Sequence, residues 1–255
     1  MRLLVTGGTG VVGRHAAAEL VRRGHSVAVL SRRGTSRSAG VEAFTGDLTT
    51  GEGLEKALDG VDCVVDCTNI ETTRRRTAVA FFTATTSRLA QAVGLGHLVV
   101  LSIVGIDDVP FGYYEGKLAQ ERTALDGPVP ATVLRATQFH EFAGQLLDGL
   151  KVGPLSAVPE MLVQPIAAAE VGVALAEVAE SRPRGRAPDV AGPQPEHLPD
   201  MARRLVRHRG QRRYVLPLRL PGRTGSAMRG GKLLPGSDAV LRGPSFAEWL
   251  AALKQ

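Results

Sequence analysis

The chain has 255 residues, of which 44% are hydrophobic and 22% are charged, and its formal net charge at pH 7 is +6. This composition is typical of a soluble globular protein, and only two cysteines, Cys63 and Cys67, are present, which excludes disulfide stapling as an organising principle. No signal peptide precedes the first glycines and no apolar run approaches the roughly 20 residues of a membrane-spanning helix, so we expect a cytoplasmic protein without a membrane partner.

The first half of the chain alternates short β-branched segments with segments of helical periodicity. Strands are expected at residues 2–6, 26–31, 41–45, 61–66, 97–102 and 131–136. Helices are expected near residues 11–23, 52–59, 77–93 and 113–125. Segments such as LVVLS and VDCVVD are apolar on both faces, as expected when helices cover both sides of a sheet. The alternation predicts an α/β protein with a doubly wound parallel sheet of the Rossmann type.

The pattern weakens after about residue 150 into pieces interrupted by proline and glycine. Helices are expected there near residues 168–180, 197–208 and 245–254. These pieces predict a small irregular C-terminal lobe built beside the sheet. The expected domains are a dinucleotide-binding domain over 1–150 and a smaller substrate-side lobe over 151–255.

Charge is distributed unevenly, because residues 181–255 carry 15 Lys+Arg and 5 Asp+Glu whereas residues 1–180 carry 16 and 20. Clustered arginines neutralise phosphates in nucleic-acid-binding proteins. Neither a helix-turn-helix signal nor interleaved aromatic residues accompany the charge here. We therefore interpret it as an arginine-rich surface and expect no nucleic-acid partner.

A glycine-rich segment, TGGTGVVGR at residues 6–14, follows the first expected strand and opens the first expected helix. Gly7 permits a tight turn, Gly10 lets the backbone approach a pyrophosphate, and Gly13 lets helix and strand pack closely. The free N–H groups at the start of the helix then face the phosphates. An ordinary strand-to-helix turn is the alternative. The predicted cofactor contacts of this segment are Gly7, Thr9, Gly10, Val12, Gly13 and Arg14.

The end of the second expected strand distinguishes the two nicotinamide dinucleotides. An acidic residue there binds the ribose 2′-hydroxyl of NAD, whereas arginine accommodates the 2′-phosphate of NADP. This chain has Ser31, Arg32 and Arg33 at that place, which favours NADP(H). Solvated turn residues are the alternative. Asp47, in TGDL, follows the third strand and is either an adenine contact or a helix N-cap.

The TGxxGxxG pattern, the GDL segment, the serine that ends LVVLS and the YYEGK segment together resemble the atypical short-chain dehydrogenase/reductase superfamily, in particular its NmrA-like NAD(P)H-binding branch. The resemblance extends over the whole chain and includes VLRATQFHEF and the closing FAEWL. It implies a dinucleotide bound across the carboxyl ends of the strands and a variable C-terminal lobe over the nicotinamide. Some members of this branch are reductases, and others only sense the cofactor.

The resemblance also implies a catalytic group of serine, tyrosine and lysine, for which the candidates are Ser102, Tyr113 and Lys117. Tyr113 and Lys117 are four residues apart and share a face of one expected helix. An adjacent ammonium is expected to lower the pKa of the phenol, which is near 10 in free tyrosine. In the family the lysine also holds the nicotinamide ribose, and the serine orients the substrate carbonyl. A helix start with a partly buried aromatic residue is the alternative, and Tyr114 competes with Tyr113.

Further polar residues follow the fourth and sixth strands. Asn69 resembles a position where the family backbone passes the nicotinamide ribose, and an ordinary turn asparagine is the alternative. His140 is either a second proton donor or, as we favour, a structural residue. The basic run 74–76 is interpreted as a solvated helix start. No metal site is expected, because no His, Cys or Asp cluster has ligand spacing.

The sequence thus predicts an NADP(H)-dependent oxidoreductase that acts on a carbonyl or enone of a small organic molecule. In that reaction Tyr113 is the acid, Ser102 orients the carbonyl and Lys117 anchors the ribose. A non-catalytic NADP(H)-binding sensor or regulatory protein is the main alternative, and a nucleic-acid-associated protein is a third. The sequence indicates neither a particular substrate nor an oligomeric state.

Overall fold

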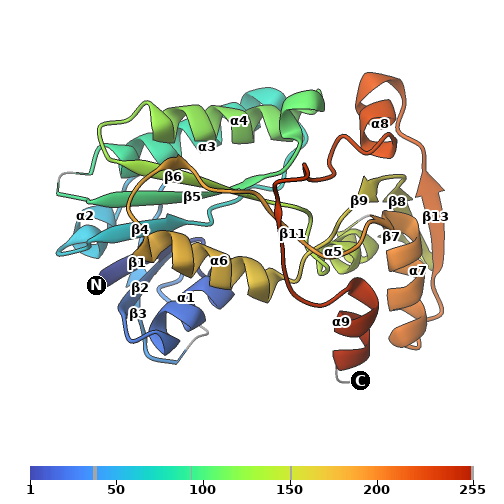
Figure 1. Ribbon diagram of the computed structural model, residues 1–255, viewed down its shortest axis with the longest axis horizontal. Coiled ribbons are helices and arrows are strands. Elements are labelled where there is room, and N and C mark those ends of the chain that lie inside the picture. Colours follow the sequence, from blue (N-terminus) through green and yellow to red (C-terminus); the bar gives the residue numbers. More distant parts are fainter. Residues whose placement is uncertain (37–38, 93, 150, 254–255) are drawn as a thin grey trace. The chain divides into compact units, whose positions relative to one another are not determined.

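The computed structural model describes residues 1–36, 39–92, 94–149 and 151–253 (Figure 1). The chain forms two compact units, and each unit is drawn from separate segments. Unit 1 comprises Met1–Ser102, Phe111–Arg135 and Val171–Pro188, and unit 2 comprises Ile103–Pro110, Ala136–Glu170 and Asp189–Gln255. The expected division into domains at residue 150 stays a prediction, because compactness alone does not show which segments fold independently.

Unit 1 is built on a parallel sheet with the strand order β3-β2-β1-β4-β5-β6. The strands are β1 (Arg2–Thr6), β2 (Ser26–Ser31), β3 (Val41–Thr45), β4 (Cys63–Asp66), β5 (His97–Ile103) and β6 (Ala131–Ala136), and a short β10 (Gly185–Arg186) also pairs with β6. The pairs β1–β2, β1–β4, β2–β3 and β4–β5 are all parallel. This is the strand order of the dinucleotide-binding Rossmann fold, so the predicted fold class is confirmed.

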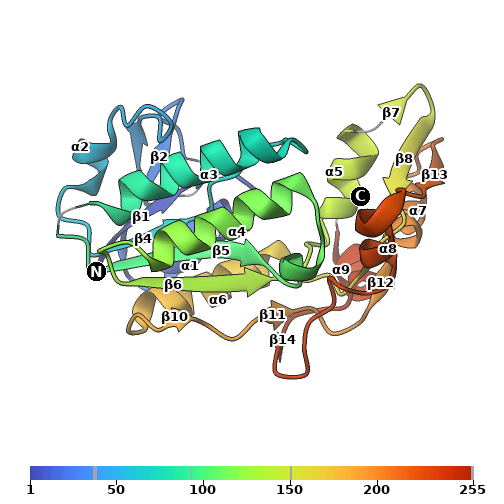
Figure 2. The same ribbon diagram turned by 90° about the horizontal axis from the view of Figure 1, so that it is seen from above.

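Helices cover both faces of this sheet, as Figures 1 and 2 show. One face carries α3 (Arg75–Ala90) and α4 (Gly112–Leu125), with the short α2 (Leu54–Leu58) in the same hydrophobic core, and the other carries α1 (Gly13–Arg22) and α6 (Ala168–Glu180). Two glycines allow the helices to approach closely. A Cβ on Gly116 of α4 would lie 2.6 Å from Cβ of Ala78 on α3, and one on Gly172 of α6 would lie 2.8 Å from Cβ of His15 on α1.

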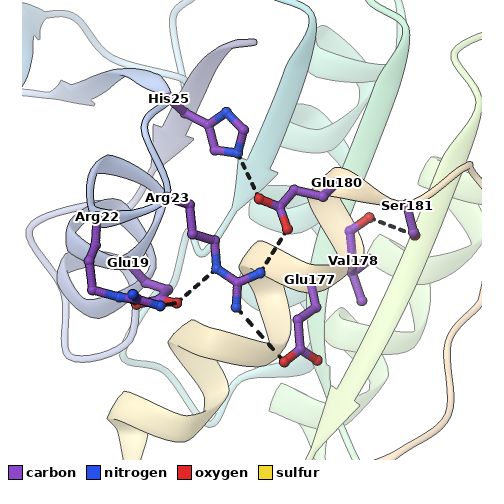
Figure 3. Close-up of polar contacts among 8 residues, drawn as sticks. All are labelled: Glu19, Arg22, Arg23, His25, Glu177, Val178, Glu180 and Ser181. Atoms are coloured by element: carbon purple, nitrogen blue, oxygen red, sulfur yellow. Dashed lines mark hydrogen bonds and ion pairs between the residues drawn. The ribbon is translucent and has the colours of Figure 1, made fainter.

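A network of ion pairs joins the carboxyl ends of α1 and α6 (Figure 3). The guanidinium of Arg23 lies 2.8 Å from the carboxylate of Glu19 and 2.7 Å from that of Glu180. Glu180 also lies 2.8 Å from Nε2 of His25 at the start of β2. The network therefore fixes the end of α6 against the turn between α1 and β2.

Unit 2 contains a three-stranded sheet in the order β13-β8-β7, a two-stranded pair of β12 and β9, and a parallel pair of β11 and β14. Its strands are β7 (Lys151–Val152), β8 (Leu155–Pro159), β9 (Leu162–Val163), β11 (Val190–Ala191), β12 (Glu196–His197), β13 (Tyr214–Leu218) and β14 (Val240–Leu241). Its helices are α5 (Phe142–Gly149), α7 (Leu198–His208), α8 (Gly222–Arg229), α9 (Phe246–Ala252) and a short 3-10 helix (Ile106–Asp108).

His140 is part of the core of unit 2. It is fully buried, its Nε2 lies 3.0 Å from the carbonyl oxygen of Pro244, and its ring lies 5.5 Å from that of Phe246 and 5.3 Å from that of Trp249. These contacts place His140 among the residues that hold α9, as favoured from the sequence. Ser245 and Glu248 form a capping box at the start of that helix.

The predicted strands of unit 1 all form, although β4 begins at Cys63 and not at residue 61. The predicted helices also form with shifted ends, whereas α5 and α8 were not predicted. In the part of the chain that the structure describes, every helix is too short or too polar to cross a bilayer.

Candidate functional site

The glycine-rich loop between β1 and α1 is a tight turn against the end of β4. Gly7 has a φ of +65°, and its carbonyl oxygen accepts a 2.9 Å hydrogen bond from the backbone N–H of Gly10. A Cβ on Gly7 would lie 2.4 Å from the carbonyl oxygen of Cys67, and one on Gly13 would lie 2.3 Å from that of Gly7. Gly7 and Gly13 are thus required by the protein's own packing.

Gly10 differs from these two glycines because little of the protein lies against it. A Cβ there would meet only the carbonyl oxygen of Gly7, at 3.1 Å, and Gly10 is exposed. Helix α1 begins without a side-chain cap, since Val12 occupies the N-cap position, and the backbone N–H groups of Arg14 and His15 bond to the carbonyl oxygens of Gly10 and Val12. Thr9 is exposed and Arg14 is half-buried beside this surface. The arrangement fits the pyrophosphate of a dinucleotide.

The turn after β2 presents two arginines to solvent. Arg32 and Arg33 are exposed, whereas the hydroxyl of Ser31 is engaged with the backbone N–H and carbonyl oxygen of Thr35, both at 3.2 Å. Exposed guanidinium groups at this place fit a ribose phosphate.

Asp47 is held by its own turn. Its carboxylate accepts hydrogen bonds of 2.7 Å from the backbone N–H and the hydroxyl of Thr49. These bonds, with a smaller contribution from the charge of Arg32, lower the pKa of Asp47. Helix α2 is preceded at its N-cap by Gly53, so the alternative of Asp47 as the N-cap of that helix is wrong.

Tyr113 lies on the first turn of α4 and points to the loop after β4. Its hydroxyl donates a 2.7 Å hydrogen bond to Oδ1 of Asn69. Tyr113 is half-buried, whereas Tyr114 is buried and packs its ring edge-on against Phe111. Burial raises the pKa of Tyr113, which is opposite to the lowering expected from a neighbouring lysine.

The ammonium of Lys117 is turned into the interior of unit 1. Its Nζ donates a 2.7 Å hydrogen bond to the carbonyl oxygen of Leu101 and a second bond to Oε1 of Gln120, and it lies 4.8 Å from the ring centre of Phe82. Burial lowers the pKa of Lys117 to about 8, although the carboxylates of Asp66 and Glu121 oppose this shift. Lys117 is therefore a buried amine whose charge depends on pH near neutrality.

A buried carboxylate continues the network beyond Lys117. Asp66, at the end of β4, accepts hydrogen bonds from the hydroxyl of Thr6 at 2.7 Å, the backbone N–H of Thr68 at 2.9 Å and Nε2 of Gln120 at 2.9 Å. Asp66 and Gln120 are both fully buried. Neither residue was predicted as part of the site, and the one signal in the sequence for Asp66 is a charged residue at the end of an otherwise apolar strand.

Ser102 lies near the end of β5 and is only 2% exposed. Its hydroxyl lies beside the buried carboxylate of Glu121, which also binds Arg135 through two bonds of 2.7 Å and Arg186 at 2.9 Å. Burial acts to raise the pKa of Glu121, but these partners outweigh it and the pKa is lowered. Ser102 thus adjoins a buried ion pair, and its role as carbonyl orienter stays a prediction.

Neither cysteine forms a disulfide, and burial raises the pKa of Cys63 to about 12 and that of Cys67 further. Within the described residues, no group of three His, Cys, Asp or Glu side chains is placed to hold a metal ion.

Comparisons with known proteins identify a family and relatives of the chain. Residues 7–145 match a family described as NAD(P)H-binding. The chain is 33% identical over 204 residues to a (4-alkanoyl-5-oxo-2,5-dihydrofuran-3-yl)methyl phosphate reductase of Streptomyces griseus, with 75% of this chain and 68% of that protein covered. It is 29% identical to the decarboxylating sterol-4-alpha-carboxylate 3-dehydrogenase of Mus musculus, over 49% of this chain and 41% of that protein.

Solved structures with low sequence identity share the fold. The NADPH-dependent quinone oxidoreductase of Escherichia coli, solved with NADPH, has a TM-score of 0.74 at 19% identity, with 98% of each chain covered. The UDP-glucose 4-epimerase of Thermus thermophilus, solved with NAD, has a TM-score of 0.67 at 20% identity, with 99% of this chain and 92% of that chain covered.

Proposed function

The chain belongs to the NAD(P)H-binding family and is an NAD(P)H-dependent oxidoreductase of the atypical short-chain dehydrogenase/reductase superfamily, and we propose that it uses NADP(H) to reduce a carbonyl or enone of a small organic molecule. The observation that carries this proposal is the position of the Tyr113 phenol. The phenol bonds to Asn69. Asn69 follows Cys67 by two residues, and the backbone of Cys67 packs against Gly7 of the glycine loop. In this proposal, the proton donor and the phosphate-binding loop both lie at the carboxyl ends of β1 and β4.

The residues of unit 1 fit the parts of an NADP molecule. The open surface at Gly10, just before α1, fits the pyrophosphate, and the exposed Arg32 and Arg33 fit a 2′-phosphate. Asp47 retains carboxylate oxygen for the adenine amino group, because both of its side-chain bonds to Thr49 go to Oδ1. Asn69 is the proposed ribose contact, and Lys117 would have to leave its bonds to Leu101 and Gln120 to reach the ribose. When bound, the dinucleotide supplies the hydride of the reaction.

Tyr113 supplies the proton in this scheme. As hydride reaches the carbonyl carbon, the carbonyl oxygen takes the proton of the phenol hydroxyl, and the phenolate is then reprotonated from solvent. Burial raises the pKa of Tyr113, so the phenol carries its proton at neutral pH and is a weaker acid than free tyrosine. Ser102 is proposed to orient the carbonyl.

The relatives support a reductase and agree with the proposed substrate class. The Streptomyces griseus protein is named for a phosphate ester whose ring carries an oxo and an alkanoyl group, and the solved Escherichia coli protein is named for quinones. Carbonyl groups are common to both names. An activated carbonyl or enone is therefore the first class to test.

The second candidate function is an NADP(H) sensor without turnover. One specific observation favours it, since the hydroxyl of Tyr113 and the ammonium of Lys117 both have protein partners, Asn69 for the first and Leu101 and Gln120 for the second. A sensor would bind the dinucleotide at the same loop and leave it unchanged.

The decisive experiment measures cofactor preference and turnover on the same preparation. We expect NADPH to bind at least tenfold more tightly than NADH in calorimetric titration, a difference of about 1.4 kcal/mol. Arg32→Ala combined with Arg33→Ala should remove most of this difference, whereas Arg182→Ala, at an exposed arginine of the same unit, should leave it intact. Equal affinities in the unaltered protein would contradict the preference for NADP(H). NADPH oxidation with a panel of carbonyls and enones then separates reductase from sensor.

A further inference from the structure

Large apolar side chains are exposed together on the β13-β8-β7 sheet of unit 2. Val152 is 81% exposed, Tyr214 69%, Leu216 49%, Leu218 41% and Leu155 40%. We call these five residues the outer sheet face. Contiguous exposed apolar surface of this kind marks a binding surface more often than scattered single residues do.

The strand register places all five side chains on one side of the sheet. Val152 pairs with Leu155 and Leu155 pairs with Tyr214, so these three form a row across the strands. Leu216 and Leu218 follow Tyr214 at alternate positions and point the same way. The opposite side is packed within the unit, where Ser156 and Val158 are fully buried and the hydroxyl of Ser156 bonds to the carbonyl oxygen of Leu147 on α5.

Basic residues border the outer sheet face. Arg212 lies two residues before Tyr214 and Arg219 follows Leu218 directly, whereas Lys151 pairs with Ser156 and so lies on the opposite side of the sheet. All three are exposed, and no carboxylate within the described chain pairs with them. The nearby Arg213 is different, because it lies 3.0 Å from the carboxylate of Asp148. The outer sheet face is therefore apolar, with an exposed arginine next to each end of its strand β13.

This combination of properties selects among possible occupants. A symmetric contact with a second copy would bring the border against itself and place like charges together. A nucleic acid would meet an apolar centre, whereas interfaces with nucleic acids are more polar and more positively charged than those between proteins. An anionic lipid surface satisfies both parts, since apolar and aromatic side chains enter the headgroup boundary while lysine and arginine bind the lipid phosphates.

We propose that the outer sheet face docks unit 2 on a membrane surface that contains anionic lipids. The sequence predicts no membrane partner because no segment is long and apolar enough to span a bilayer, and docking at the surface needs no such segment. The proposal is independent of the reduction reaction, because each residue that carries it belongs to unit 2 and none to the glycine loop or to α4.

The test is co-sedimentation of the full chain with vesicles of phosphatidylcholine, with and without phosphatidylglycerol. We expect at least tenfold stronger partition to the anionic vesicles, reduced as the ionic strength rises from ~0.05 M to ~0.5 M. Arg212→Glu with Arg219→Glu should lower this partition by about twentyfold or more, since each basic residue near the surface contributes about fivefold. Tyr214→Ser with Leu216→Ser should lower it by about tenfold or more through loss of apolar contact.

The matched control is Val240→Ser with Leu241→Ser, because these residues are also exposed apolar residues of a strand in unit 2, at 39% and 56%, yet lie outside the outer sheet face. The control should partition as the unaltered protein does. Retained NADPH binding and melting temperature would show that each variant is folded.

Three outcomes would overturn the proposal. The first is equal partition of the unaltered protein to both vesicles, or none. The second is that light scattering shows the unaltered protein as an oligomer and the Tyr214→Ser, Leu216→Ser variant as a monomer, which would assign the face to contact with a second copy. The third is retention of double-stranded DNA, but not of vesicles, with loss of retention in the Arg212 and Arg219 variant.

Discussion

The phenol hydroxyl of Tyr113 donates a 2.7 Å hydrogen bond to Oδ1 of Asn69, which joins the first turn of α4 to the loop after β4. The ring of Tyr113 also packs edge-on against Phe82 of α3 and against Tyr114. The phenol is therefore held in one place by contacts on two sides. Of the two adjacent tyrosines, Tyr113 presents its hydroxyl at the carboxyl edge of the sheet.

Replacing this phenol tests the proposed proton donor. Tyr113→Phe removes one hydroxyl and should lower kcat by roughly 10²- to 10⁴-fold, with little change in NADPH affinity. Tyr114→Phe is the matched control and should retain activity near that of the unaltered protein, because Tyr114 is buried against Phe111. Steady-state kinetics with an active carbonyl substrate give both values. Full turnover in Tyr113→Phe would refute the assignment without affecting the cofactor site.

The buried amine of Lys117 should make stability depend on pH. Its pKa is lowered from 10.5 to about 8, so above pH 8 the folded protein releases this proton while the unfolded chain still holds it. The free energy of unfolding should therefore rise between pH 8 and 10.5 relative to a Lys117→Met variant, by up to about 3 kcal/mol. Below pH 8 the ammonium is charged in both states, and the cost of burying it is fully present.

Denaturant unfolding of both proteins at several pH values measures this difference. Gln120→Leu provides a second arm, because it removes the Oε1 acceptor of Lys117 and the donor to Asp66. It should destabilise the protein by a few kcal/mol, since Asp66 then loses a buried partner. Parallel pH curves for the unaltered protein and Lys117→Met would show that the amine titrates as it does in water.

The glycine loop should separate binding from stability. Gly10→Val should abolish NADPH binding and lower the free energy of unfolding by less than about 1 kcal/mol, because little of the protein lies against Gly10. Gly13→Ala should instead destabilise the fold, since its Cβ would lie 2.3 Å from the carbonyl oxygen of Gly7. Calorimetric titration and thermal unfolding measure the two effects. If Gly10→Val binds NADPH with undiminished affinity, the loop is only a structural turn and does not bind the pyrophosphate.

Ser102→Ala tests the proposed carbonyl orienter. It should lower kcat/KM by about tenfold or more through loss of one hydrogen-bond donor to the carbonyl. The melting temperature should change little, because Glu121 keeps its bonds to Arg135 and Arg186. Kinetics and thermal unfolding on the same variant give both readouts. Unchanged kinetics with a lower melting temperature would instead assign Ser102 to the buried ion pair.

The parts of unit 1 that the sequence predicted depend on local signals. A run such as RLLVT before TGGTG indicates both the strand and the turn, because β-branched residues and glycine are close neighbours there. Alternation of strands and helices then determines a parallel order through the handedness of their connections. Helices α5 and α8 were not predicted, because the glycines in FAGQLLDG and GRTGSAMR are typical of loops.

The buried network could not be predicted in the same way. Asp66 and Gln120 are 54 residues apart, and their contact requires β4 and α4 to be adjacent in space. The prediction that the pKa of Tyr113 is lowered was wrong for the same reason, since the pKa is raised. The i, i+4 spacing placed Lys117 on the correct helical face, but which way its ammonium turns depends on Leu101 and Gln120.

The third segment of unit 1 bears on how the chain folds as it is synthesised. Gly172 of α6 lies against His15, and Arg23 bonds to Glu180, so part of the cover over α1 comes from residues far along the chain. Ala16 and Leu20, on the buried side of α1, lie in the core of the finished fold. While the ribosome is still adding residues before 171, this side of the nascent chain is incompletely shielded. A nascent or truncated chain that stops at residue 150 should therefore expose apolar surface and aggregate, whereas one that extends through Pro188 can close it.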